Sequence, residues 1–110
     1  MSVTRWTGAE KKIARRAFEA ALERALAITM AEFKAKAAAA VSPSDMWAVE
    51  NFLRDRRREI DRIFDYRYSQ LLLVFPQLIR RKYLDESQLA GLSEDKLEEI
   101  RHYLSYGRQE

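Results

Sequence analysis

The sequence has 110 residues, 47% of them hydrophobic and 34% charged, which predicts one folded, soluble domain and excludes a disordered chain. It has no cysteine, no apolar run near the roughly 18–20 residues of a membrane span and no signal-peptide core, so we expect a cytoplasmic protein without disulfides, zinc–cysteine sites or membrane contact. The net charge of +3 comes from interleaved basic and acidic residues, which is weak support for nucleic-acid binding.

Few helix breakers interrupt the chain. Three glycines and two prolines stand among many alanine, leucine, glutamate and arginine residues, which predicts an all-α protein. The first helix is expected to begin at a capping box formed by Thr7 and Glu10. No glycine or proline follows until Pro43, so this helix is expected to reach about Val41 and to be about 50 Å long. Such a helix predicts an elongated molecule.

Large apolar side chains, with alanines between them, predict the buried face of this first helix. They are Ile13, Phe18, Leu22, Leu26, Met30 and Phe33. The alanines would allow a second helix to approach closely, although the run Ala37–Ala40 could equally reflect helix propensity alone. Trp6, just before the cap, is expected to pack onto the side chains of residues 11–13.

A short turn is expected to join the first helix to a second one. Ser42 would cap the new helix and Pro43 would occupy its first position. Two long helices with a short link predict an antiparallel hairpin. Because a two-helix hairpin leaves much apolar surface in water, we expect two copies to pair into a four-helix bundle, which predicts a homodimer.

The stretch 46–73 contains most of the informative residues. One stripe of long side chains, in alternating steps of three and four, consists of Met46, Val49, Leu53, Arg56, Ile60, Ile63 and Arg67. Arginines on the apolar side of a helix suggest a partner helix that carries carboxylates, so we interpret this stretch as an interface. Trp47 fits a core or interface anchor, the residue type enriched at binding hot spots.

The second helix also carries closely spaced charges. Its sequence predicts four ion pairs within the helix, namely Glu50/Arg54, Arg57/Asp61, Asp55/Arg58 and Glu59/Arg62. The arginine-rich face from Arg54 to Arg62 is therefore interpreted first as solvated and ion-paired. A nucleic-acid-binding face is the alternative.

The remainder is expected to form a compact group of short helices. The apolar segment 69–84 should be buried and bent at Pro76, and Asp85 to Gln88 should cap a short turn ended by Gly91. Ser93 should cap a last helix that runs to about Tyr106. These features predict a single domain, 1–110, with a hairpin stalk over 6–67 and a helical head over 68–110.

Catalytic and cofactor motifs are absent from the sequence. It has no Ser/His/Asp order, glycine-rich phosphate loop or HExxH motif, and its single histidine, His102, fits a surface position. We therefore predict no enzyme activity, catalytic residue, metal ligand or cofactor. The group Tyr66-Arg67-Tyr68 could stack nucleobases, but packing against the other helices is the favoured interpretation.

Several of these segments together resemble the fluorescence recovery protein family. The matching segments are Trp6-Thr7 with Glu10, Trp47, FLRDRRREID (52–61), DYRYSQLLLVF (65–75), Gln77-Leu78 and QLAGLSEDK (88–96). The resemblance covers the whole chain and implies an all-α homodimer without enzyme activity. It also implies that the protein binds the photoactivated orange carotenoid protein of cyanobacteria, speeds its return to the dark form and frees the antenna from quenching.

The resemblance places the dimer and partner-binding surface around Trp47 and Arg57. With the neighbouring positions, the candidate site residues are Trp47, Arg57, Glu50, Asn51, Leu53 and Leu73. The family pattern has His-Asp at Glu50-Asn51, Phe at Leu73, Lys at Glu99 and Glu-Gly at Arg81-Lys82. Such changes alter charge, which governs partner choice. The client is therefore the carotenoid protein or another protein, and a small basic nucleic-acid-binding dimer and a helical interaction module remain the alternatives.

Overall fold

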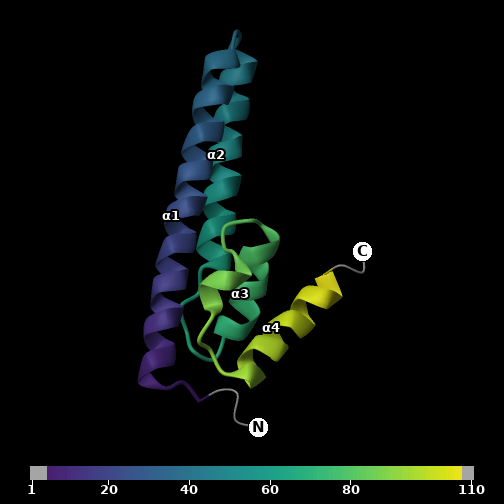
Figure 1. Ribbon diagram of the computed structural model, residues 1–110. Coiled ribbons are helices and arrows are strands. Elements are labelled where there is room, and N and C mark those ends of the chain that lie inside the picture. Colours follow the sequence, from purple (N-terminus) through teal and green to yellow (C-terminus); the bar gives the residue numbers. More distant parts are fainter. Residues whose placement is uncertain (1–4, 108–110) are drawn as a thin grey trace.

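A long helical hairpin with short helices packed against its base makes up the molecule (Figure 1). The structure is a computed structural model that describes residues 5–107, where it is all-helical, as predicted. The elements in chain order are α1 (Gly8–Ala39), α2 (Pro43–Ile63), α3 (Leu71–Arg80), the 3₁₀ helix η2 (Glu86–Leu89) and α4 (Glu94–Gly107). The molecule is elongated, 55 × 30 × 21 Å.

The ends of the helices follow from local hydrogen bonds. At the start of α1 the Thr7 hydroxyl accepts from the Glu10 amide at 3.1 Å and the Glu10 carboxylate accepts from the Thr7 amide at 3.0 Å, as the capping box predicts. The helix ends at Ala39, two residues before the predicted Val41, because Ala40 adopts an extended conformation. The Ser42 hydroxyl accepts from the Asp45 amide at 3.1 Å and caps α2.

The buried face of α1 is narrower than predicted and consists of small side chains. Ala14, Ala17, Ala21 and Ala25 are at most 2% exposed, whereas the large Leu26 and Met30 are 53% and 52% exposed. The expectation that the large residues form the buried face is therefore wrong for these two. Small side chains let the other helices approach the axis of α1 closely, and this places the larger side chains at the edges of the contact.

The α2 helix ends at Ile63. The predicted stripe of long side chains on this helix was therefore wrong in its last member, Arg67. Residues 64–70 form the connection to α3, so Arg67 leaves the helical register and its exposed guanidinium pairs with Asp65 at 2.6 Å. The pairing holds the pKa of the Asp65 carboxyl below its usual value. Arg67 therefore does not extend the stripe of α2.

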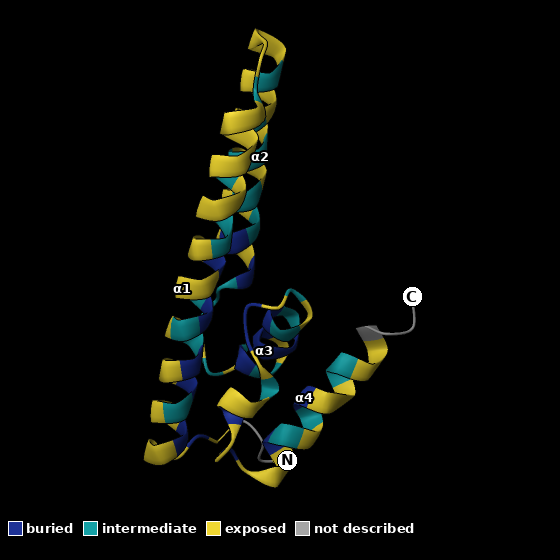
Figure 2. Ribbon diagram, turned by 45° about the horizontal axis from the view of Figure 1, so that its top comes forward, coloured by how far each residue is buried: buried dark blue, intermediate teal, exposed yellow. Residues whose placement is uncertain are grey.

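The core lies where α3, η2 and α4 meet the base of the hairpin. Its largest fully buried side chains are Phe75, Ile63, Leu71, Leu78, Leu89 and Ile100. Figure 2 shows the difference along the hairpin: burial concentrates at the base, and the far end is mostly exposed. No helix in residues 5–107 is both long and apolar enough to cross a membrane. The division of the single domain 1–110 into a stalk (6–67) and a head (68–110) stays a prediction. Residues 1–4 and 108–110 of this domain lie outside the described part.

A buried ion pair joins the two ends of the described chain. Lys96 on α4 donates to the Glu10 carboxylate at 3.2 Å and to the Arg5 carbonyl at 2.6 Å, and the same carboxylate accepts from the Ser93 amide at 2.9 Å. The Lys96 ammonium also lies 4.9 Å from the Trp6 ring centre, and Trp6 packs on Tyr68. Trp6 thus belongs to the core near the start of α4, and Ile13, one of its predicted partners, packs against the same core.

Candidate protein-binding surface on the hairpin

An exposed apolar stripe runs along one side of the hairpin. It consists of Leu26, Met30 and Phe33 on α1, Val41 in the turn, and Met46, Val49 and Leu53 on α2. Met46 is 51% exposed and Val41 is 90% exposed. Between the two helices the stripe holds a shallow, almost wholly apolar hollow of about 330 Å³, lined by Phe33, Ala37, Ala40, Met46, Val49, Glu50 and Leu53. Exposed apolar side chains gathered on one side of a protein are typical of surfaces that contact other proteins.

Trp47 lies next to this stripe, near the start of α2. Its side chain is 59% exposed, which corrects the interpretation of Trp47 as a core anchor of a single chain. An indole in water is an unfavourable arrangement unless a partner covers it, and tryptophan is enriched at the centres of protein interfaces. The interface interpretation of Trp47 stays a prediction.

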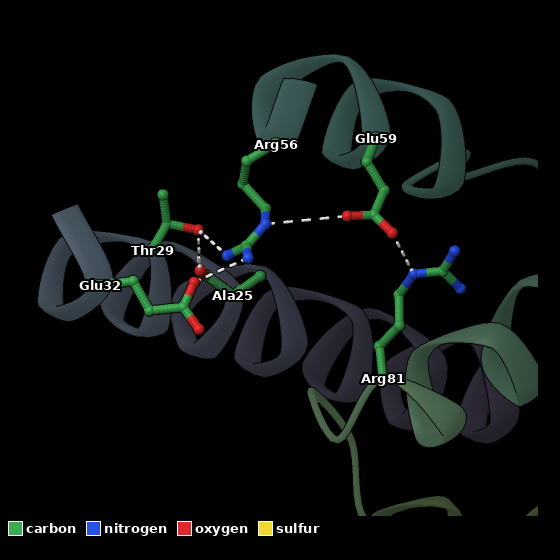
Figure 3. Close-up of polar contacts among 6 residues, drawn as sticks. All are labelled: Ala25, Thr29, Glu32, Arg56, Glu59 and Arg81. Carbon is green, nitrogen blue, oxygen red and sulfur yellow. Dashed lines mark hydrogen bonds and ion pairs between the residues drawn. The ribbon is translucent and has the colours of Figure 1, made fainter. Parts of the chain in front are cut away.

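Arg56 has its carboxylate partner within the same chain (Figure 3). Its guanidinium donates to the Thr29 hydroxyl at 3.0 Å and to Glu32 at 2.7 Å, both on α1. The side chain is only 18% exposed. Arg56 therefore holds α1 and α2 of one chain together. Its place on the apolar side of α2 is explained without a partner helix from a second copy of the chain.

The arginine-rich face of α2 is partly neutralised by carboxylates. Two of the predicted pairs form, Arg54–Glu50 at 2.8 Å and Arg57–Asp61 at 4.0 Å. The predicted pairs Asp55/Arg58 and Glu59/Arg62 do not form among the described residues. Glu59 instead pairs with Arg56 at 3.8 Å and with Arg81, which follows α3, at 2.6 Å. These pairs reduce the positive charge available to a nucleic acid on this face.

The tyrosines of the connection between α2 and α3 are half-buried and pack against other elements. Tyr66 packs edge-on against Phe18, with ring centres 4.8 Å apart, and Tyr68 packs on Trp6. Burial, together with the neighbouring Tyr68, raises the pKa of Tyr66 to about 12. Tyr66 therefore stays neutral at physiological pH, and packing against other elements, the favoured interpretation of this group, is confirmed.

The structure brings only part of the predicted site together. Glu50 and Leu53 line the hollow in the stripe, Asn51 lies one turn after Trp47, and Arg57 is exposed two turns further along α2. Leu73 belongs to α3 and is 42% exposed there, away from the hollow. Leu26 and Met30 extend the exposed surface and were not predicted as site residues. Their four-residue spacing was visible in the sequence, but it was assigned to the core.

Comparisons with known proteins agree with this architecture. The family model described as photoprotection regulator fluorescence recovery protein matches residues 6–104. The chain belongs to the fluorescence recovery protein family. It is 32% identical over 96 residues to the fluorescence recovery protein of Synechocystis sp. (strain PCC 6803), covering 87% of this chain and 88% of that relative.

Solved structures of fluorescence recovery proteins share the fold. The protein from Fremyella diplosiphon has a TM-score of 0.86 at 36% identity, with 93% of this chain and 99% of that chain covered. The protein from Synechocystis sp. PCC 6803 has a TM-score of 0.87 at 31% identity, with 92% and 99% covered. The chain is thus an all-α member of a family of photoprotection regulators.

Proposed function

We propose that this member of the fluorescence recovery protein family is a cytoplasmic homodimer that binds the photoactivated orange carotenoid protein, speeds its return to the dark form and so ends antenna quenching. Membership of the family over residues 6–104 is the observation that carries the proposal. The exposed Trp47 beside an apolar stripe adds a surface with which a regulator of this kind can bind other proteins.

The apolar stripe supports pairing of two copies. It extends from Leu26 to Leu53 along both helices of the hairpin, and half or more of Leu26, Met30 and Met46 is exposed. Two hairpins laid side by side would bury these residues against each other as a four-helix bundle. Sedimentation at micromolar concentration should therefore give twice the mass of one chain. Met30→Glu should shift the equilibrium to a folded monomer, and a wild-type monomer would contradict the dimer.

The client is proposed to contact the surface around Trp47 and Arg57. The other proposed contact residues are Glu50, Asn51, Leu53 and Leu73. A protein without catalytic groups accelerates a conformational change by binding its transition state more tightly than the starting state. If the binding free energy for the transition state is more favourable than that for the starting state by about 1.4 kcal/mol, the return to the dark form is tenfold faster. The exposed indole of Trp47 and the Arg57 side chain, which is 84% exposed, suit such differential binding.

Timing the colour recovery of the photoactivated carotenoid protein tests this proposal. The wild-type chain should shorten the recovery time in proportion to its concentration until saturation. Trp47→Ala should remove most of the acceleration. Tyr106→Ala is the matched control, because Tyr106 is equally exposed, at 61%, but lies at the end of α4. An unchanged recovery rate at saturating wild-type protein would refute the assignment of this client.

Charge at Glu50 gives a second test of the same surface. The Glu50 carboxylate is paired with Arg54 at 2.8 Å, at a position where the family pattern has histidine. Glu50→His should change the association rate with the client and its dependence on salt, since charges at the rim of an interface steer encounter. An association rate that stays the same at low and high salt would place Glu50 outside the contact.

A further inference from the structure

A groove with four cations on its rim lies at the base of α1, at the opposite end of the hairpin from Trp47. Four cations line it, Lys11, Lys12, Arg15 and Arg16, together with Tyr68, Ala20, Leu22 and Leu26 and with two carboxylates, Glu19 and Glu23, which follow the cations along α1. The groove is open and measures about 880 Å³. The helical rise places Lys11 about 40 Å from the end of α1 at the hairpin turn, and Leu26, at the other end of the groove, about 20 Å from it.

The positive charge of this basic groove is only partly compensated, since two glutamates, Glu19 and Glu23, line it beside four cations. The ion pair that the described residues form there is Arg15–Glu19, at 3.9 Å with both side chains more than half exposed, and such a pair contributes little. Lys11 lies 5.2 Å from the ring centre of Tyr68, and Arg15 lies 4.4 Å from that of Tyr66. The rings hold these two cations in place without neutralising them. On α2, by contrast, Arg54 and Arg56 have carboxylate partners at 2.8 and 2.7 Å.

We propose that the basic groove docks an acidic, amphipathic helical segment of a partner protein, on a surface separate from the Trp47 region. The apolar part of the lining, Leu22, Ala20 and Tyr68, would accept the apolar face of such a helix, whereas Leu26 at the far end of the groove belongs to the apolar stripe. The four cations would pair with its carboxylates. Because Glu19 and Glu23 follow the cations along α1, the acidic end of the segment would lie toward the start of α1.

The same features disfavour a nucleic acid as the occupant. The cations span five residue steps, about 8 Å of helix, which is a short track for a phosphate backbone. The two glutamates beyond them would repel the next phosphates. Lys11 already covers a face of the Tyr68 ring, so this ring offers no free stacking platform.

Peptide binding to the full chain tests the proposal. The probe is a fluorescent helical peptide of about five turns with leucines on one face and glutamates elsewhere, measured by anisotropy at low salt. A peptide with lysine in place of glutamate and a single-stranded RNA of the same charge are the other two probes. The acidic peptide should bind, and the lysine peptide and the RNA should bind at least tenfold more weakly.

Charge reversal in the groove supplies the matched variants. Lys12→Glu combined with Arg16→Glu should weaken the acidic peptide about tenfold, because each exposed pair contributes up to about 1 kcal/mol. Lys34→Glu, exposed on the same helix outside the groove, should change binding less than twofold. Trp47→Ala should leave peptide binding unchanged, which separates this proposal from the proposed function. Circular dichroism checks that each variant is folded.

Three results would overturn the proposal. One is that the acidic peptide does not bind the wild-type chain, and another is that RNA binds as tightly as the peptide and is equally sensitive to the groove variant. The third is that Lys12→Glu with Arg16→Glu leaves the peptide affinity unchanged and instead alters the dissociation constant of the homodimer. The basic groove would then be a contact between two copies of the chain.

Discussion

Replacing Lys96 by methionine is expected to destabilise the fold by about 3 kcal/mol. The Lys96 and Glu10 side chains are only 4% and 8% exposed, and their charges are 3.2 Å apart. Removing one partner of a buried pair costs about 3–5 kcal/mol, since the other charge stays buried without compensation. The Glu10 carboxylate would keep its hydrogen bonds from the Thr7 and Ser93 amides, at 3.0 and 2.9 Å, so we expect the lower end of that range.

Thermal unfolding followed by circular dichroism measures this loss. A change of about 3 kcal/mol in a domain of this length lowers the Tm by about 12–24 °C. All samples need the same protein concentration, because self-association shifts the Tm. Lys34→Met is the control, as an exposed lysine on α1, and should stay within about 0.5 kcal/mol of the wild type.

The double variant Lys96→Met with Glu10→Gln tests the reason for the loss. It removes both charges, so it should recover part of the stability that Lys96→Met loses, and the two changes should be coupled in a double-mutant cycle. A loss below about 1 kcal/mol in Lys96→Met, or strictly additive effects in the cycle, would refute the view that an unpaired buried charge causes the destabilisation.

Three further predictions concern stability. Burial raises the pKa of Glu10, but hydrogen bonds from Thr7, Ser93 and Lys96 outweigh it, so the pKa lies below 4.5. The stability from this group is therefore present above pH 4.5 and lost as the pH falls through the lowered pKa. In urea titrations the free energy of unfolding of the wild type should exceed that of Glu10→Gln above pH 4.5, and the excess should disappear as the pH falls toward 3. An excess that does not change with pH would contradict this. Gly91→Ala should cost about 1–3 kcal/mol in urea unfolding, because Gly91 has φ +106° and a Cβ would lie 2.5 Å from Ile13; a neutral effect would contradict it. Phe75→Ala should cost about 3–5 kcal/mol in the same assay, since Phe75 is fully buried, and a cost below 1 kcal/mol would indicate that the core collapses around the gap.

The starts of the helices were predictable because each depends on a few neighbouring residues, whereas the ends of α1 and α2 differ from the prediction. The capping box of Thr7 with Glu10, the Ser42 cap before Pro43 and the Asp85–Gln88 box all form as predicted. The ion pair Glu50–Arg54 formed for the same reason, since residues four apart on a helix are neighbours whatever surrounds them.

Contacts between distant segments were less predictable. The spacing predicts that Glu59 pairs with Arg62, three residues away. In the fold Glu59 pairs with Arg81, 22 residues away, at 2.6 Å. Leu26 and Met30 were predicted to be buried because of their helical spacing, but both are exposed in the fold. In the candidate site, Trp47, Glu50 and Leu53 lie close together because they belong to successive turns of one helix, whereas Leu73 on α3 does not join the hollow that Glu50 and Leu53 line.

The sequence by itself determined the all-α class, the hairpin and the starts of the capped helices, because periodicity and capping act within a few residues of one helix. Only the tertiary structure decided which face of α1 is buried, that Arg56 is bound by Thr29 and Glu32, and that Glu10 meets Lys96 across 86 residues. Packing selects these contacts because the row of small alanines allows the closest approach of the neighbouring helices, and the longer side chains take the positions that remain.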